Sequence, residues 1–570
     1  MPAPVKLFFM KQLYFIFTLF SCLFIHCSNA QGSDKKSTAD IIYKNAKIWT
    51  GDTGNQSAGS IAILGNRIIY VGNNADPFTG SNTKLIDVKG KLLVPGFIDN
   101  HTHFLTGGYQ LTAVNLREAA SKTAFINTLK TYISKLTDDR WIQGGDWDHE
   151  AMGGELPTKE WIDSVTGNHP IFVNRYDGHM ALANSVALKL AGIDKNTITP
   201  PGGEIVRDPV TNEPTGVLKD EAMSLVYKIM PEPSEKELDE MLQRAAAHAL
   251  QNGVTQVNDV SSYGGWLDLK TYTTAHKKNR LNIRIYSFVA IATWKRLDEY
   301  VKQNGRGDDM LRWGGLKGFV DGSLGSTTAW FYQPYLDDKK STGLIVTDTN
   351  DLRRDILAAD AAGLQVTVHA IGDRANDWLL NVFETAEKIK GNSNSRFRIE
   401  HAQHLSAAAI NSFAALNVIP SMQPYHAIDD GKWAAKRLDD DRLKRTYAFK
   451  SLLNAHAKLT FGSDWTVAPL TPIEGIYAAV TRRTLDDKNP TGWYPEQKIS
   501  VEDALRCYTV NNAYAGFHEN KTGMLKVGML ADFVILSDDL FKIAPEKIKD
   551  VKVLQTILDG KIVYDAVEKE

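Results

Sequence analysis

The feature that most constrains the fold of this chain is a series of eight apolar, β-rich runs, most of them separated by helical stretches. Strands that alternate with helices predict a parallel sheet. Eight such units are the number that closes a (β/α)8 barrel, whose active site lies at the C-terminal ends of the strands. The predicted strands span 92–99, 254–260, 283–291, 316–321, 364–371, 397–403, 418–423 and 459–464.

Further β-rich runs at both ends of the chain indicate a second, smaller β layer. They occupy 41–50, 60–72 and 83–94 near the start, and 531–536 and 551–565 near the end. Because their apolar and polar residues alternate, we expect half-buried strands. We predict that residues 40–92 and 525–570 build one composite β-sandwich, and that residues 93–524 form the barrel domain.

The stretch between the first and second barrel strands is too long to be a loop. It runs from about residue 105 to 250, and structureless loops of that length are not found in compact domains. We therefore predict an inserted subdomain after the first barrel strand. Its aromatic residues Trp141, Trp147 and Tyr176 suit a lid or a pocket wall.

The first thirty residues have the pattern of a secretory signal peptide. Two lysines precede an apolar run over 13–25, and small residues follow up to Ala30. The run is shorter than the ~20 residues that span a bilayer, so no stable membrane insertion is expected after cleavage. We predict a secreted or periplasmic protein, cleaved after Ala30. A lipidated Cys27 is the less favoured alternative, because bulky residues precede it.

The composition argues against a polyanion-binding protein. Of the 570 residues, 43 % are hydrophobic and 23 % are charged, and the formal net charge is −2. These values are ordinary for a globular protein and offer no basic surface to a nucleic acid. Without the signal peptide, Cys507 is the last cysteine, so the mature protein would have no intramolecular disulfide.

Two histidines at the end of the first barrel strand are half of a possible metal site. The strand stops at Asp99, and His101 and His103 follow one residue apart. In an extended chain, residues i and i+2 point to the same face. Imidazole suits zinc and its neighbours. Alone, a His-x-His pair more often lies on a protein surface than in a metal site. Whether His101 and His103 bind a metal therefore depends on further ligands later in the chain.

Suitable partners occur at the ends of later strands. His369, His401 and Asp464 lie at or near the ends of such strands, and Lys317 lies in another. Each has a plainer interpretation, since a buried histidine usually makes hydrogen bonds and Asp464 could cap a helix. Together they fall at the end of the barrel where a site must lie. We therefore predict a divalent metal site.

The motifs around these residues resemble the amidohydrolase superfamily, close to its amidohydrolase-3 branch, over nearly the whole mature chain. The matching blocks are Val94-Pro-Gly-Phe-Ile-Asp-Asn-His-Thr-His103, Asp177-Gly-His-Met-Ala-Leu-Ala-Asn-Ser185, Gly315-Leu-Lys-Gly-Phe-Val-Asp-Gly-Ser-Leu-Gly-Ser326, Val368-His-Ala-Ile-Gly-Asp-Arg-Ala375, Ile399-Glu-His-Ala-Gln403, Met422-Gln-Pro-Tyr-His426 and Gly462-Ser-Asp-Trp-Thr-Val467. Near the end, residues 523–534 resemble the family's return into its β-sandwich.

The resemblance implies a ligand set. His101 and His103 would hold one divalent metal, with zinc preferred, and His369 and His401 would hold a second. Asp464 would contact the metal site. Lys317 would be carbamylated and would bridge two ions, whereas an unmodified lysine would fit a mononuclear site.

The expected reaction is hydrolysis of a non-peptide C–N bond in a small amide by metal-activated water. Asp464 would orient the water and carry its proton to the leaving nitrogen. His426 and His179 are candidates for oxyanion stabilisation or substrate contact. Asp99 and Glu400 would fix the imidazoles, and Ser323 is a weaker candidate for positioning.

Two alternative functions stay open, and so does assembly into a homodimer. One is a mononuclear deaminase of the same superfamily, although such enzymes usually place a glutamate soon after the equivalent of His369, and none follows here. The other is a non-catalytic binding protein on the same fold. A serine or cysteine hydrolase has little support, because no Gly-x-Ser-x-Gly motif stands out.

Overall fold

The computed structural model describes residues 37–149, 152–175, 180–200, 203–260, 265–325, 327–391 and 394–566. Residues 38–570 form one compact unit. The predicted signal peptide and His179 lie outside the described residues. No helix in the described ranges is both long and apolar enough to cross a membrane.

The centre of the molecule is an eight-stranded parallel sheet, which confirms the predicted barrel. Its strand order is β21-β20-β19-β18-β17-β16-β15-β8, so each barrel strand pairs with the barrel strands that precede and follow it in the chain. The strands are β8 (Phe97–Thr102), β15 (Val254–Asp259), β16 (Arg284–Ala290), β17 (Leu311–Phe319), β18 (Gln365–Ala370), β19 (Arg398–His401), β20 (Ile419–Met422) and β21 (Thr460–Phe461).

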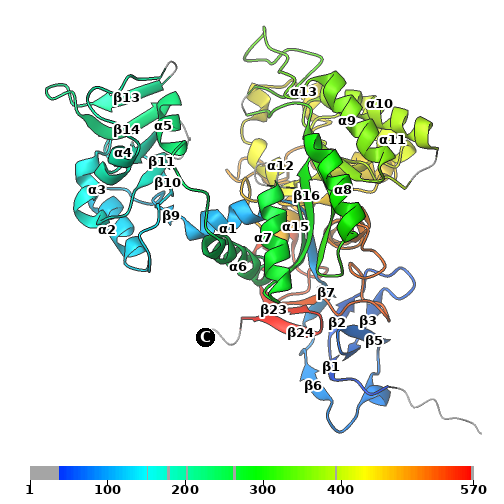
Figure 1. The fold of residues 1–570 in the computed structure, drawn as a ribbon. Coiled ribbons are helices and arrows are strands. Elements are labelled where there is room, and N and C mark those ends of the chain that lie inside the picture. Colours follow the sequence, from blue (N-terminus) through cyan, green and yellow to red (C-terminus); the bar gives the residue numbers. More distant parts are fainter. Residues whose placement is uncertain are drawn as a thin grey trace, which may run out of the picture. The chain divides into compact units, whose positions relative to one another are not determined.

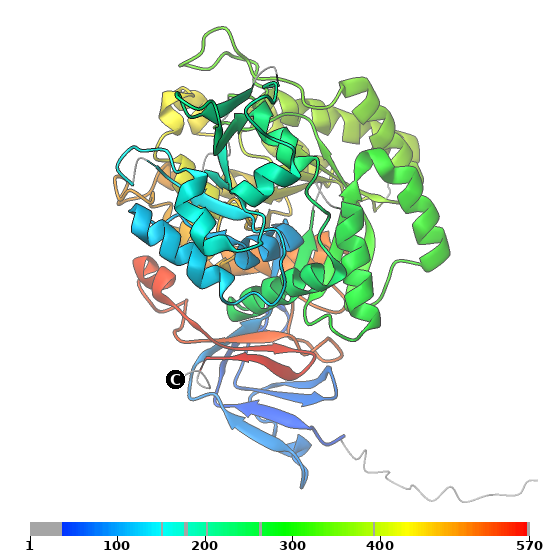
Figure 2. The same ribbon diagram turned by 60° about the vertical axis from the view of Figure 1, so that its left-hand side comes forward.

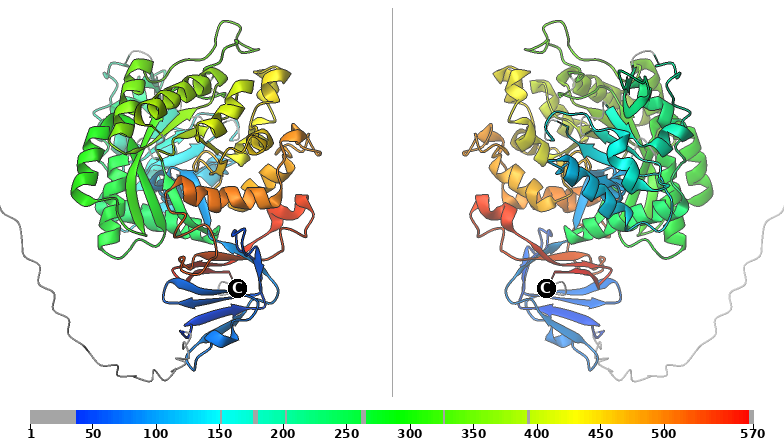
Figure 3. Two further views of the ribbon diagram at one scale, coloured as in Figure 1. Left: turned by 90° about the vertical axis from the view of Figure 1, so that its right-hand side faces the viewer. Right: turned by 90° about the vertical axis from the view of Figure 1, so that its left-hand side faces the viewer.

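Helices cover the outside of this sheet (Figures 1 and 3). On β18, Val366 and Val368 are fully buried in the large apolar core, while Thr367 between them makes a polar contact with Glu400. The barrel helices are α6 (Glu235–Gln251), α7 (Gly265–Lys277), α8 (Trp294–Asn304), α9 (Thr349–Ala361), α10 (Asp373–Lys390), α11 (Ala407–Ala415), α12 (Pro424–Asp430), α13 (Asp440–Leu443), α14 (Phe449–Asn454), α15 (Pro472–Thr481), α16 (Val501–Tyr508) and α17 (Val510–Ala515). A capping box of Ser234 and Glu237 begins α6.

The first and last barrel strands are joined by the segment that follows β21. The predicted strand over 459–464 is regular only at Thr460–Phe461. Beyond it, the Asp464 amide donates to the His101 carbonyl at 2.8 Å, and the His103 amide donates to the Trp465 carbonyl at 2.7 Å. Asp464 itself has a left-handed φ of 59°, which turns the chain at the barrel mouth.

The predicted single strand over 92–99 is wrong, because the structure divides it at Gly96. β7 (Leu92–Pro95) pairs with a C-terminal strand, whereas β8 pairs with β15 in the barrel. A Cβ at Gly96 would overlap the Thr255 side chain on β15. Glycine thus permits the close approach at which the chain passes from one sheet to the other.

Two sheets built from the chain ends form the predicted β-sandwich (Figure 2). Tyr43 and Phe533 pack edge to face between them, with ring centroids 5.0 Å apart. One sheet contains β1 (Ile41–Lys44), β4 (Ser60–Leu64), β5 (Arg67–Gly72) and β6 (Lys84–Asp87), and the other contains β2 (Lys47–Trp49), β3 (Ser57–Ala58), β7, β22 (Phe533–Leu536), β23 (Val553–Leu558) and β24 (Lys561–Asp565).

The insertion after β8 contains a six-stranded sheet of its own, with the order β13-β14-β12-β11-β10-β9. Two apolar clusters belong to it, one around Phe125 and Trp147 and one around Phe172 and Leu218. Its strands are β9 (Val114–Asn115), β10 (Gly144–Trp147), β11 (Phe172–Arg175), β12 (Met180–Ala183), β13 (Gly203–Arg207) and β14 (Pro214–Asp220), and its helices are α2 (Lys122–Ile133), α3 (Lys159–Thr166), α4 (Ser185–Leu190) and α5 (Ser224–Tyr227). Helix α1 (Phe104–Thr112) leads into it from β8 and packs against α6.

Candidate metal centre

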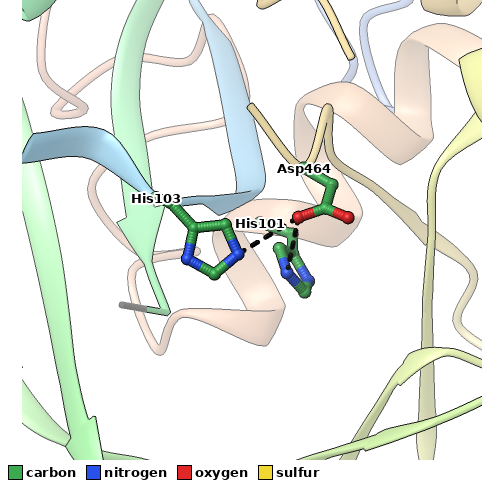
Figure 4. Close-up of side chains that lie close together, drawn as sticks. All are labelled: His101, His103 and Asp464. Atoms are coloured by element: carbon green, nitrogen blue, oxygen red, sulfur yellow. Dashed lines mark ion pairs between the residues drawn. The ribbon is translucent and has the colours of Figure 1, made fainter. Parts of the chain in front are cut away.

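Three of the predicted ligands converge where the first and last barrel strands meet. The Asp464 Oδ1 atom lies 3.3 Å from His101 Nε2 and 3.2 Å from His103 Nε2 (Figure 4). His101 is fully buried and Asp464 is nearly so. One carboxylate oxygen therefore faces two imidazole nitrogens in a site largely shielded from water.

A second group shares the same carboxylate. His401, His426 and Asp464 each offer a ligand atom, and these atoms lie within 4.8 Å of one another. The His426 Nε2 atom is 3.9 Å from Asp464 Oδ2. The two oxygens of Asp464 thus face two different sets of histidines, an arrangement that suits a carboxylate in contact with one or two cations.

His369 lies beside this second group. Its ring centroid is 4.5 Å from that of His401, and its Nε2 atom lies 2.9 Å from the Gly322 carbonyl oxygen. Because a carbonyl only accepts, that nitrogen is the protonated one, and Nδ1 is left as the atom with a lone pair. Burial lowers the pKa of His369 to about 3, so the ring is neutral at physiological pH.

Lys317 is buried on β17 and is paired in register with Thr367 on β18. Burial lowers the pKa of its ammonium group to about 8, although Glu400 and Asp464 oppose this shift. A lysine in this environment is partly neutral near pH 8 and is therefore nucleophilic.

The free nitrogen atoms of the site fit a cation. His101 Nε2 and His426 Nε2 are both buried and have no hydrogen-bond partner among the described residues. Buried polar atoms are rarely left so. A divalent metal would accept the lone pair of His101 Nε2 and would balance the Asp464 carboxylate, so the donor set fits the metal that the sequence predicts.

The charges of the carboxylates are stabilised within the site. Burial opposes ionisation of Asp464, but the nearby imidazoles of His101 and His103 outweigh it and hold the pKa of Asp464 well below its usual value. Burial likewise opposes ionisation of Glu400, and Arg398 and His101 outweigh it, so the pKa of Glu400 is also well below its usual value. Both groups are therefore anionic at neutral pH.

The rings of His101 and His401 are oriented by neighbouring side chains. Glu400 Oε2 lies 2.5 Å from His101 Nδ1, and Arg398 Nε donates to Glu400 Oε1 at 2.8 Å. Gln423 Oε1 lies 2.8 Å from His401 Nδ1. Such contacts hold the proton on Nδ1 and leave Nε2 for a metal. Glu400 was expected from the sequence, whereas Gln423 was missed.

Asp99 acts on the backbone rather than on an imidazole, contrary to the prediction. Its Oδ1 atom accepts from the His101 amide at 3.1 Å and from the Ser463 amide at 2.9 Å. It thereby ties the ligand-bearing end of β8 to the segment that carries Asp464. Burial raises the pKa of Asp99 to about 6.

The carboxylate of Asp321, which we did not predict from the sequence, organises the loops after β17 and β18. Asp321 accepts hydrogen bonds from the amides of Trp330 at 2.7 Å, Gly372 at 2.8 Å and Ile371 at 2.9 Å. Ser323 lies in the first of these loops, one residue after the Gly322 carbonyl that contacts His369. The Asp321-Gly322 pair at a strand end was the available signal.

Several known proteins are similar to this chain over most of its length. The sequence model of the amidohydrolase family matches residues 84–564. Protein LONG AFTER FAR-RED 3 of Arabidopsis thaliana is 42 % identical and covers 92 % of each chain. N-substituted formamide deformylase of Arthrobacter pascens is 25 % identical, covering 92 % of this chain and 98 % of the enzyme. The crystal structure of an uncharacterized metal-dependent hydrolase from Pyrococcus horikoshii OT3 superposes with a TM-score of 0.73 at 29 % identity, covering 89 % and 99 % of the two chains.

Proposed function

Because the chain belongs to the amidohydrolase family and is a metal-dependent hydrolase of that family, we propose that it hydrolyses a non-peptide C–N bond in a small amide. The observation that carries the proposal is the position of Asp464, whose two carboxylate oxygens face His101 and His103 on one side and His426 on the other. A formamide deformylase among the relatives supports the choice of an amide.

His101, His103 and Asp464 would hold one divalent ion, with zinc preferred, and His369 and His401 would hold a second where two are bound. When bound, such an ion supplies a Lewis acid that acidifies water and polarises a carbonyl group. Glu400 and Gln423 contact the Nδ1 atoms of His101 and His401, so the Nε2 lone pairs of these rings stay available to a metal. The Gly322 carbonyl contacts His369 Nε2, which leaves the Nδ1 lone pair of that ring.

Asp464 is the proton carrier in this proposal. Its low pKa keeps the carboxylate ionised at neutral pH, so it can accept the proton of the attacking water and deliver it to the leaving nitrogen. His426 Nε2 is buried at the same site without a hydrogen-bond partner among the described residues. It would donate to the carbonyl oxygen as negative charge develops there.

Lys317 would be carbamylated. The neutral amine attacks carbon dioxide, a C–N bond forms, one proton is released, and the product is an anionic carbamate whose oxygens can bridge two cations. Its burial and its pKa of about 8 support this step, because the neutral amine is then substantially populated near physiological pH.

We also propose that the protein is exported and cleaved after Ala30, on the basis of the charge, apolar run and small residues in the first thirty positions. Amino-terminal sequencing of protein recovered from the exported fraction should then begin at Gln31. A mature start at Cys27 would instead indicate a lipid-anchored protein.

The reaction is tested with a panel of N-formyl, N-acetyl and cyclic amides assayed with added zinc. Once the parent hydrolyses one of them, Asp464→Asn should lower turnover by roughly 100-fold or more while metal binding largely survives. Asparagine also tolerates the left-handed φ of 59° at this position. His426→Ala should slow turnover and leave the metals in place.

Asp487→Asn is the matched control, because Asp487 has a φ of 57° but is exposed and outside the site. It should keep parental turnover. Near-normal turnover of Asp464→Asn would contradict the proposal. Failure of the parent on every amide, with release of ammonia from an aminated ring, would favour a deaminase.

A further inference from the structure

A solvent-accessible cavity of about 290 Å³ lies away from the metal centre, among the first residues of three barrel strands. Arg312 near the start of β17 and Gln365 at the start of β18 line it, and Tyr286 on β16 completes this wall. Lys317 follows Arg312 by five residues on the same strand, a separation of roughly 16 Å in an extended chain. The cavity is therefore separate from the metal centre.

The cavity carries an excess of positive charge. Arg306, Arg312 and Lys390 line it together with one carboxylate, Asp360. That carboxylate is already engaged, because Lys390 Nζ lies 3.0 Å from Asp360 Oδ1. Neither guanidinium forms an ion pair with another described residue: Arg306 donates to the Gly363 carbonyl at 2.8 Å, and Arg312 donates to the Gly516 carbonyl. Within the described residues, no carboxylate therefore lies at ion-pair distance from either guanidinium group.

Polar atoms in the wall also lack partners. Arg312 Nη2 and Gln365 Oε1 are buried and make no hydrogen bond with any part of the chain that the structure describes. Burial lowers the pKa of the Arg312 guanidinium to about 10, so the group is still charged at neutral pH. An unpaired buried guanidinium is costly unless a ligand or water satisfies it.

Aromatic rings form the apolar part of the cavity. Tyr286, Trp313 and Phe517 all line it, and the Arg312 guanidinium lies 4.9 Å from the centroid of the Tyr286 ring. The Trp313 indole is fixed by a 2.8 Å hydrogen bond to the Gly305 carbonyl, whereas Phe517 is 40 % exposed at the rim. Flat apolar walls beside guanidinium groups suit a ring that bears a carboxylate.

We propose that this cavity is a second ligand site, which binds a small organic anion whose carboxylate meets Arg306 and Arg312 and whose apolar ring packs against Tyr286, Trp313 and Phe517. Guanidinium is the preferred protein group for carboxylates because its donors match the two oxygens. The site does not depend on the reaction at the metal centre.

The test uses 4-fluorobenzoate as the probe, observed by fluorine NMR with the zinc-loaded protein, and 4-fluorobenzyl alcohol as its uncharged analogue. The parent should bind the benzoate and should bind the alcohol at least ten-fold more weakly. Arg312→Met should weaken benzoate binding roughly ten-fold or more, the usual effect of losing a hydrogen bond to a charged group. Arg306→Gln, an exposed substitution that spares the fold, should weaken it several-fold.

Arg353→Gln is the matched control, because Arg353 is exposed on α9 and does not line the cavity. It should bind as the parent does. Benzoate could also occupy the metal centre. In that case His103→Ala, and not the cavity substitutions, should abolish its binding. Binding that survives both cavity substitutions, or that is lost only in His103→Ala, would overturn the proposal, as would the absence of binding to the parent at millimolar probe.

Discussion

Glu400 Oε2 lies 2.5 Å from His101 Nδ1, and both side chains are fully buried in the barrel. Arg398 binds the other oxygen of Glu400 and also donates to the Asn100 carbonyl at 2.7 Å. His101 is thus held from behind by a charged pair that is itself anchored to β8, the strand that carries this histidine. The orientation of the His101 ring therefore depends on Glu400 and Arg398.

Glu400→Gln should therefore weaken zinc binding by about 10- to 100-fold, the usual effect of losing a carboxylate behind a ligating histidine. The amide keeps the size of the side chain but removes the charge that makes the imidazole basic. Zinc affinity is measured by titration against a competing chelator. Glu546→Gln, at an exposed position, should bind zinc as the parent does. Parental zinc affinity in Glu400→Gln would show that His101 needs no such support.

The sequence was sufficient to predict the barrel, because apolar runs and helical stretches are local patterns. It could not show that Leu92–Pro95 and Phe97–Thr102 belong to different sheets. That division depends on the close approach of Gly96 to Thr255, which lies some 160 residues away in the chain. The sequence shows an apolar run on both sides of Gly96, so it gives no sign of the division.

The contacts behind the ligands were also only partly predictable. Glu400 precedes His401 in a recognisable motif, but it supports His101, which is distant in sequence. Gln423 lies in a matching motif, but the motif does not show which side chain it contacts, and its contact with His401 depends on the pairing of β19 with β20. Tertiary register, which sequence patterns do not encode residue by residue, determines these pairs.

When zinc is added back to the metal-free protein, the rate at which activity returns should depend on pH and on carbon dioxide through Lys317. With a pKa of about 8, the amine is mainly cationic below pH 8 and mainly neutral above it, and only the neutral form attacks carbon dioxide. Reactivation by zinc at constant dissolved carbon dioxide should thus accelerate as pH rises through about 8. Activity is followed against time after zinc addition.

Lys317→Arg is the comparison, because it stays charged and cannot form a carbamate at this position. It should retain about one ion per chain or fewer and should not respond to carbon dioxide. An intact mass showing unmodified Lys317 in a protein with two bound metals would contradict the carbamate.

Gly107→Ala should damage the metal centre although Gly107 is not a ligand. In an unobstructed helix this substitution stabilises by roughly 1 kcal/mol, but here the added Cβ would overlap the Trp465 ring. Trp465 follows Asp464, and its carbonyl accepts from the His103 amide. Overpacking of this kind costs about 1–3 kcal/mol. We expect a lower unfolding midpoint together with reduced zinc content and turnover.

Thr106→Ala is the control for this substitution, since Thr106 is exposed on the same helix. It should leave stability, zinc content and turnover close to those of the parent. If Gly107→Ala also keeps parental zinc content and unfolding midpoint, then Trp465 can move without displacing Asp464 and His103.

Arg284 should be among the side chains that most stabilise the contact between the barrel and the sandwich. It lies on β16, is 2 % exposed, and contacts Asp532 at 2.6 Å and Asp559 at 2.5 Å. Asp532 directly precedes β22, and Asp559 lies between β23 and β24. Arg284→Met would leave the buried Asp532 carboxylate without its partner, which costs about 3–5 kcal/mol.

This cost should appear as a large fall in the urea midpoint of unfolding. Arg67→Met removes a partly exposed pair with Asp309, whose atoms lie 3.3 Å apart, and should cost about 1 kcal/mol or less. The double substitution Arg284→Met with Asp532→Leu should recover much of the loss, because the unpaired buried charge is then absent. Equal urea midpoints for Arg284→Met and Arg67→Met would mean that apolar packing alone holds the barrel to the sandwich.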